Sequence, residues 1–279
     1  MRSGAAVRTK VLSIAAAAAL LAPWTAMGDS STADDRIAVS ADGSTLTGTN
    51  GGAGASLGWL HNFDAASLAG VAVEYQDLST ARWTFGSVNG SLTRGPDDQR
   101  YSVYGEAHEG AGDDGPRAFR YAIESAGVIG TYFRRLSAQL EDREINVDNI
   151  HGNLPKAGLS YLWGPHLLTS ASYSYSVSGN LGTRLTTARI DEYNASVNFL
   201  AGIAFGQASP IVVGTVSNLP VILAQAHKLK EGYVGMSKDL PHLRSGVTFV
   251  ADYQDLSGFK RITLTLSYIF HVGHTGTAK

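Results

Sequence analysis

The feature that most constrains the fold is a strict two-residue alternation over residues 261–270, the last predicted strand. The even positions carry Ile262, Leu264, Leu266, Tyr268 and Phe270, whereas the odd positions from 261 to 267 carry Arg, Thr, Thr and Ser. Successive side chains of a strand point to opposite faces, so one face is apolar and the other is small and polar. In a soluble sandwich the apolar face would cover a core; in a membrane barrel it would meet lipid while the polar face lines the lumen.

The same alternation recurs from Ala55 onward, in segments separated by turn residues. The two clearest segments lie at 170–177, where Tyr and Val alternate with four serines, and at 192–199, where Tyr, Ala, Val and Phe alternate with Glu, Asn and Ser. One hexapeptide, residues 74–79, recurs almost unchanged at 252–257, each time at the end of an alternating strand. The segments predict an all-β fold, a transmembrane antiparallel up-and-down β-barrel of about twelve strands, with a range of about 10–14.

The N-terminus has the layout of a cleaved signal peptide, residues 1–28. A positive stretch precedes the apolar segment 11–22, and small residues at Ala26 and Gly28 mark a cut before Asp29. Residues 29–54 are rich in Ser, Thr, Gly and Ala without a sustained apolar period, which predicts a flexible lead-in. The sequence therefore predicts a barrel over 55–271 and a tail over 272–279.

Composition excludes several functions. Three of the 22 Lys and Arg residues and none of the 24 Asp and Glu residues lie in 1–28, so the mature chain has a formal charge of −5. An acidic chain without a basic stripe argues against a nucleic-acid partner. The chain has no Cys, which excludes disulfides and thiol chemistry. After the leader no apolar run is long enough to form a transmembrane helix.

The positions of the aromatic residues favour the membrane barrel over the soluble sandwich. Tyrosines and tryptophans on the apolar faces stand mostly near segment ends, where the two membrane interfaces would lie; they are Tyr75, Tyr161, Trp163, Tyr193, Tyr253 and Tyr268. Closing the sheet would also remove the edges that so many strands would otherwise expose.

The chain resembles the Gram-negative outer-membrane β-barrel proteins, a porin-like class, over residues 55–271. The resemblance rests on the leader, the alternation and the terminal residues 266–270, which look like the aromatic-ending strand that the barrel assembly machinery recognises. It implies outer-membrane lipid and that machinery as partners. The chain departs from the usual pattern in that residues 271–279 follow Phe270, whereas the resembled proteins usually end at the aromatic residue. The resemblance does not resolve a subfamily.

The sequence indicates no catalytic residues, metal or cofactor. None of the eight His residues stands two positions before a Ser, the pairing that barrel lipases use. A protease-like pairing could involve only His108 with Asp113 and Asp114, which share a Gly-rich segment that is more typical of a solvated turn. A barrel hydrolase is thus a minor alternative.

The polar faces of the predicted strands form a lumen lining that carries both positive and negative charges. We expect these lumen-lining residues: Glu74, Arg82, Arg120, Glu124, Ser172, Ser174, Glu192, Asn194, Asp252 and Arg261. Such a lining predicts a channel or export pore for small polar or sugar-like solutes. The alternatives are a closed structural or adhesive barrel, a barrel hydrolase and a soluble secreted β-protein. Residues 206–226 lack clean alternation and hold two prolines, so we expect a loop that constricts the lumen, with a pair of extra strands as the alternative.

Overall fold

The computed structural model describes residues 34–272, apart from 48–50, 65, 79–80, 97, 114–117, 195–196, 209–210, 214–219, 223–226 and 257–259. The predicted signal peptide and most of the predicted tail lie outside the described residues. Within the described part of the chain, no helix is long and apolar enough to cross a membrane.

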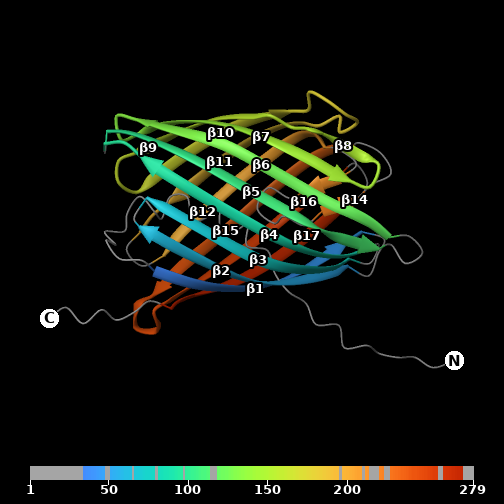
Figure 1. Cartoon of the computed structure of the whole chain (residues 1–279), viewed down its shortest axis with the longest axis horizontal. Helices are drawn as coiled ribbons and strands as arrows, with labels where there is room; N and C mark the ends of the chain where they lie inside the picture. The colour runs from blue at the N-terminus through green and yellow to red at the C-terminus, as the bar shows by residue number, and fades with distance from the viewer. Residues whose placement is uncertain are drawn as a thin grey trace.

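Fourteen antiparallel strands close into a barrel (Figure 1). They are β1 (Asp34–Leu46), β2 (Gly52–Asp64), β3 (Ser67–Leu78), β4 (Ala81–Arg94), β5 (Gln99–Asp113), β6 (Ala118–Tyr132), β7 (Leu136–Val147), β9 (Lys156–Trp163), β10 (Leu167–Tyr175), β11 (Arg184–Glu192), β12 (Asn198–Ala208), β15 (His227–Leu240), β16 (Ser245–Asp255) and β17 (Lys260–His271). Each strand pairs with its neighbours in the chain, and β1 pairs with β17 to complete the cylinder. The predicted all-β barrel is confirmed, with a strand number at the upper limit of the expected range.

The first strand corrects the predicted domain boundary. Residues 34–46 were expected to belong to a flexible lead-in, but they form β1, which pairs along eleven residues with β17 and also with β2. Ile37 is exposed on its outer face, while Ser40, Asp42 and Ser44 are buried on its inner face. The alternation escaped detection because Ala41 and Gly43 continue the outer row with side chains too small to give a clear apolar period.

A short extra strand, β8 (Ile150–Asn153), extends β9 along β7. Glu144 faces Asn153 and Glu141 faces Lys156, so both strands pair with β7 in one unbroken register. Leu154 and Pro155 separate them, since proline has no backbone N–H to donate to a ladder.

The barrel is apolar outside and polar inside. On β17, Leu264 and Leu266 are about half exposed, whereas Arg261 and Thr263 are only 1% exposed. Large apolar side chains cover the outer faces of the other strands in the same way; examples are Leu57, Val71, Val103, Val128, Leu159, Ile190, Ile203 and Val234. A soluble sandwich would bury these residues, so this arrangement contradicts the soluble β-protein alternative.

The two ends of the barrel differ in their connections. At one end, which we call the short-turn end, the connections run over 65–66, 95–98, 133–135, 164–166, 193–197 and 241–244, and β1 begins and β17 ends. The opposite, long-loop end carries the longest connection, 209–226, and the two eight-residue connections, 148–155 and 176–183. Exposed aromatic rings lie on the outer surface near each end of the barrel. Those near the short turns are Trp59, Phe63, Tyr101, Trp163, Phe199 and Phe270, and those near the long loops are Tyr173, Tyr175, Phe205 and Tyr253.

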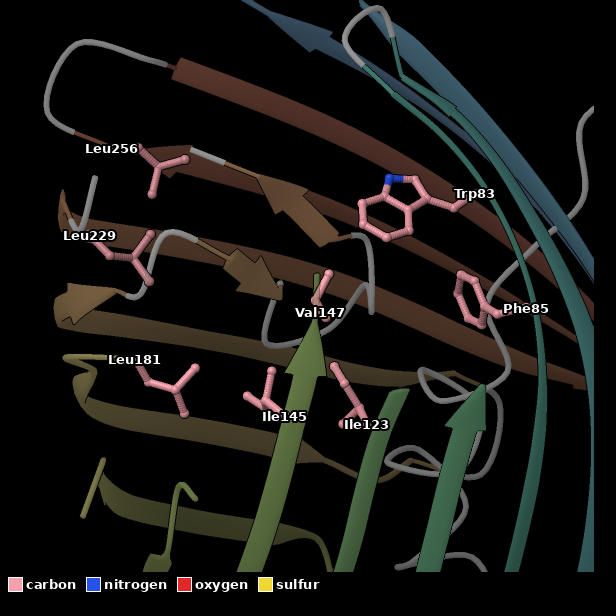
Figure 2. Packing of buried hydrophobic residues seen from close by; sticks show 8 residues of the cluster. All are labelled: Trp83, Phe85, Ile123, Ile145, Val147, Leu181, Leu229 and Leu256. Atoms are coloured by element: carbon pink, nitrogen blue, oxygen red, sulfur yellow. The ribbon is translucent and has the colours of Figure 1, made fainter. Parts of the chain in front are cut away.

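Residues 206–226 are not one structureless loop. Strand β12 continues to Ala208, and β13 (Ile211–Val213) and β14 (Pro220–Ile222) form a separate two-stranded sheet that does not join the barrel wall. The two extra strands that we kept as the alternative are therefore present, as a hairpin. Figures 1 and 2 both draw this hairpin at the long-loop end.

Candidate functional site: the barrel interior

Five of the expected lumen residues point into the barrel. Glu74, Asp252 and Arg261 are almost completely buried on the inner faces of β3, β16 and β17. Ser172 and Ser174 lie on the inner face of β10, where the Ser172 hydroxyl is 2.6 Å from that of Thr187 on β11.

Three expected lumen residues point outward instead. Arg82 is exposed on β4, where its neighbours Trp83 and Phe85 are buried inside the barrel. Arg120 and Glu124 are exposed on β6, on the face opposite the buried Ile123. All three lie in the long-loop halves of their strands, where we place the outer surface beyond the apolar band. The alternation of these segments was predicted correctly, but the face assigned to the lumen is in fact the outer face. Charged residues can face outward there because water, not lipid, contacts this part of the outer surface.

Glu192 and Asn194 also lie away from the lumen wall. Glu192 is the last residue of β11 and is exposed on the face opposite the buried Asp191. Asn194 stands in the following short turn, and its side-chain amide donates to Glu192 Oε1 at 3.1 Å. The strand expected from residue 192 begins only at Asn198, as β12.

One side of the interior is closed to solvent. We call it the buried wall; it comprises the inner faces of β15, β16, β17, β1, β2 and β3. Its acidic residues Asp42, Glu74, Glu231 and Asp252 are all at most 6% exposed, as is Arg261. The Arg261 guanidinium donates to Gln254 Oε1 at 2.6 and 3.0 Å, and Gln76 Nε2 donates to Asp42 Oδ1 at 3.4 Å. The repeated hexapeptide supplies Glu74 and Gln76 on β3 and Asp252 and Gln254 on β16.

The opposite side, which we call the open wall, comprises the inner faces of β5, β6, β7, β9, β10 and β11. Its central feature is the Glu141 cluster: Tyr104, Glu141, Arg143 and Lys156. Glu141 accepts hydrogen bonds from the Tyr104 hydroxyl at 2.7 Å, Arg143 Nη2 at 3.2 Å and Lys156 Nζ at 3.0 Å. The carboxylate side chain is 6% exposed, but those of Arg143 and Lys156 are 30% and 28% exposed. Water in the interior thus reaches the two cations and hardly reaches the anion between them.

A second pair on the open wall repeats this arrangement. The Arg189 guanidinium donates to both oxygens of Asp191, at 2.9 and 2.8 Å from Nε, and is again the more exposed partner. Glu106 is the exception, because its side chain is 22% exposed and contacts the buried His108. His108 therefore faces a carboxylate inside the wall. Asp113 lies at the end of β5, and Asp114 lies outside the described residues.

Sequence reasoning missed the cations of the open wall. The alternating segment that the sequence predicts over residues 136–141 stops at Glu141, whereas β7 continues to Val147 and places Arg143 on the same inner face. Lys156 directly follows Pro155, the end of a predicted turn, and the sequence pattern assigned it neither to that turn nor to the strand that starts at Ala157. Extending each alternating segment until its period fails would have found Arg143.

An apolar layer closes the long-loop end of the interior. Eight buried side chains form it: Trp83, Phe85, Ile123, Ile145, Val147, Leu181, Leu229 and Leu256. Figure 2 shows them converging from several strands and loops, with the two short arrows of the β13–β14 hairpin drawn among them. Ile145 and Val147 follow Glu141 and Arg143 on the inner face of β7, and Leu154 packs against the same layer. The apolar layer therefore directly adjoins the Glu141 cluster.

A depression of about 440 Å³ lies in the wall formed by β4 to β7. The side chains that border it, including Val88, Glu124, Asp142 and Glu144, are exposed on the outer faces of their strands. It is therefore a feature of the outer surface and not of the lumen.

No known family model matches this chain, and no curated protein matches its sequence. Among solved structures it is similar to the CymD monoaromatic hydrocarbon channel, with a TM-score of 0.61, 11% sequence identity, and coverage of 96% of this chain and 95% of CymD. It is also similar to a TodX monoaromatic hydrocarbon channel lacking S2 and S3, with a TM-score of 0.55, 10% identity, and coverage of 86% and 91%. At these identities the similarity shows a shared barrel fold.

Proposed function

We propose that this protein is an outer-membrane channel for small solutes. The observation that carries the proposal is the closed barrel with an apolar exterior between two rows of aromatic rings and a charged interior wall that solvent reaches. An apolar outer band with aromatic girdles matches a bilayer and its two interfaces. A water-reached row of fixed charges is what a selective passage needs.

We infer that the short-turn end faces the periplasm and the long-loop end faces the outside, as membrane barrels usually place short turns in the periplasm. The cleaved signal peptide over 1–28 and delivery by the barrel assembly machinery belong to the same proposal. We propose no covalent chemistry. His108, the histidine of the protease-like pairing, is enclosed by the wall beside Glu106 and Phe85.

The apolar layer narrows the class of solute. A strongly hydrated sugar would lose its water on passing eight buried apolar side chains, whereas a molecule with an apolar part would gain from the contact. CymD and TodX, which share the fold, are monoaromatic hydrocarbon channels. We therefore narrow the expectation of polar or sugar-like solutes to small molecules that carry an apolar portion.

Single-channel recording in planar bilayers tests the proposal. We expect discrete current steps from the purified full chain, and larger steps when residues 209–226 are replaced by a short Gly-Ser turn, because the β13–β14 hairpin is the proposed constriction. The control replaces the exposed turn 241–244 at the opposite, short-turn end by Gly and Ser, and should change the conductance less. A silent bilayer with protein that remains folded would contradict the channel.

The buried wall favours one second candidate, a closed structural or adhesive barrel. Glu74, Gln76 and Gln254 have no exposed surface, so the interior beside the buried wall is already filled. Failure to conduct in both the intact and the hairpin-deleted form would support this candidate, because the deletion removes the proposed obstruction.

A further inference from the structure

We infer that a row of cations on the outer surface, which we call the outer cation row, binds the phosphate groups of anionic lipids in the outer leaflet. The row comprises Arg184 on β11, Lys228 and Lys230 on β15, and Lys260 on β17, all exposed toward the long-loop end. The inference rests on the proposed function, which places the long-loop end at the outer leaflet. It concerns the outside of the barrel wall and adds a lipid partner to the proposed channel.

Two cations of the row stand beside aromatic rings that mark the outer edge of the apolar band. Arg184 pairs in register with Tyr175 of β10, and Lys230 pairs with Phe205 of β12. The guanidinium carbon of Arg184 lies 5.1 Å from the centre of the Tyr175 ring, so a cation–π contact holds it at the level of that ring. In a membrane barrel the aromatic rings lie at the interface, where the lipid head groups begin.

Lys260 reaches the same depth on β17. It lies two residues beyond Ile262, which is 48% exposed and pairs with Tyr253 of β16. Arg184, Lys230 and Lys260 stand on every second strand of the wall, because β12 separates the first two and β16 the last two. Adjacent strands are about 4.8 Å apart, so the three cations are about 10 Å apart along the wall. Several phosphate groups of one leaflet can therefore be bound side by side.

The cations of the row keep donors for a ligand. Arg184, Lys230 and Lys260 form no ion pair with any carboxylate that the structure describes. Among the described residues, Asp255 is the one acid on this part of the outer surface, and it pairs in register with Lys230 and with Lys260. Four exposed cations therefore stand against one carboxylate, and the row has an excess of positive charge.

Phosphate is the head group that suits such a row. An Arg guanidinium can bind two phosphate oxygens at once, and a Lys ammonium binds phosphate as a point charge. Basic residues beside a membrane surface attract anionic lipids for the same reason. The row should therefore prefer a lipid whose phosphates are not neutralised by a cationic group of its own.

The opposite side of the barrel carries the reverse charge toward the same end. The outer faces of β5, β6 and β7 present four exposed acids: Glu109, Glu124, Asp142 and Glu144. Glu124 pairs in register with Glu144, so like charges adjoin on this side. Phosphate groups would be repelled there and attracted by the outer cation row. Bound anionic lipid should therefore be confined to the side of β11 to β17.

Native mass spectrometry of the full chain in detergent tests the inference, with diphosphorylated lipid A and its phosphate-free form as probes. We expect the chain to bind the phosphorylated lipid more tightly than the phosphate-free form. The double variant Lys230→Gln, Lys260→Gln should weaken the binding about 25-fold, about fivefold for each lost charge. The double variant Lys230→Arg, Lys260→Arg should retain it, because the charges remain.

Lys238→Gln is the matched control. Lys238 is exposed on the same outer face of β15 but lies near the short-turn end, so its loss should leave the binding unchanged. The heat-modifiable shift of the folded barrel on an SDS gel should persist in every variant, because all these side chains are exposed.

Three outcomes would overturn the inference. Equal weakening by Lys238→Gln would show that any positive charge on the surface attracts the lipid. Equal binding of the phosphate-free form would show that the acyl chains alone are held. A second copy of the chain bound to the unmodified protein and lost from the glutamine double variant would make the row a protein interface.

The lipid site and the channel can fail separately. Current steps from a protein without any preference for the phosphorylated lipid would remove the lipid site and leave the channel. A silent bilayer together with the expected variant pattern in lipid binding would remove the channel and leave the lipid site.

Discussion

Gly127 is the residue that allows the Glu141 cluster to form. It lies on the inner face of β6 between Tyr104 and Glu141, and the space that its side chain would occupy is taken by the tyrosine ring. Gly202 has the same relation to Tyr233, whose hydroxyl oxygen is 2.3 Å from the position of a Cβ. A long side chain lying across a glycine is thus a recurring way of filling this interior.

We predict that Gly127→Val lowers the free energy of unfolding by about 1–3 kcal/mol, because the added methyl groups overlap the Tyr104 ring and must displace it. Urea unfolding of the barrel refolded in lipid vesicles, followed by tryptophan fluorescence, measures the change. Gly232→Val is the control, since no atom lies within 4 Å of a Cβ at that position. An equal loss in both variants would show that steric overlap at Gly127 is not the cause.

At the scale of the element, the alternation of a strand and the face that each residue takes are separate questions. On β17 the apolar residues face outward, whereas on the first part of β4 Trp83 and Phe85 face inward and Arg82 faces outward. The difference follows from how deep in the membrane each part of a strand lies. Within the apolar band lipid contacts the outer surface, and beyond the band water does.

This depth effect predicts a difference between two substitutions on the outer surface. Leu266→Arg, in the middle of β17, should cost about 2–4 kcal/mol of stability, as charged residues do at the bilayer midplane, whereas Thr84→Arg should cost less than about 1 kcal/mol. Vesicle unfolding experiments on both variants provide the measurement. Similar costs would mean that Thr84 lies within the lipid-covered band.

The sequence was sufficient to predict the barrel fold, because a two-residue period of apolar residues follows directly from the alternating side chains of a strand. It correctly placed Glu74, Asp252 and Arg261 inside. It could not place Arg82, Arg120 and Glu124, because the period carries no information about depth. It also missed β1, whose outer row includes Ala41 and Gly43, and it missed Arg143 and Lys156, whose partner Glu141 is brought to them by strand pairing.

At the scale of the whole molecule, closure depends on β1. This strand pairs with β17 on one side and β2 on the other, and Figure 1 shows the blue first strand beside the red last one. Without β1, both neighbours would have unpaired backbone groups inside a membrane, where no water can satisfy them.

Deletion of residues 34–46 is therefore expected to abolish the folded barrel. The measurement is the heat-modifiable shift of the folded barrel on an SDS gel, which the deletion should eliminate. Removal of residues 273–279, which lie beyond the end of β17, should leave the shift intact. A persistent shift in the variant without β1 would mean that β17 and β2 can pair directly.

The contrast between the two inner walls has a consequence for how such a pore could be redesigned. The buried wall serves the stability of the barrel, because any change there disturbs tightly enclosed polar contacts. Such changes should therefore appear as poor assembly. The half formed by β5 to β11 is wetted, so substitutions there should alter what passes while the cylinder survives. A new solute preference should therefore be sought by mutating residues of the open wall alone.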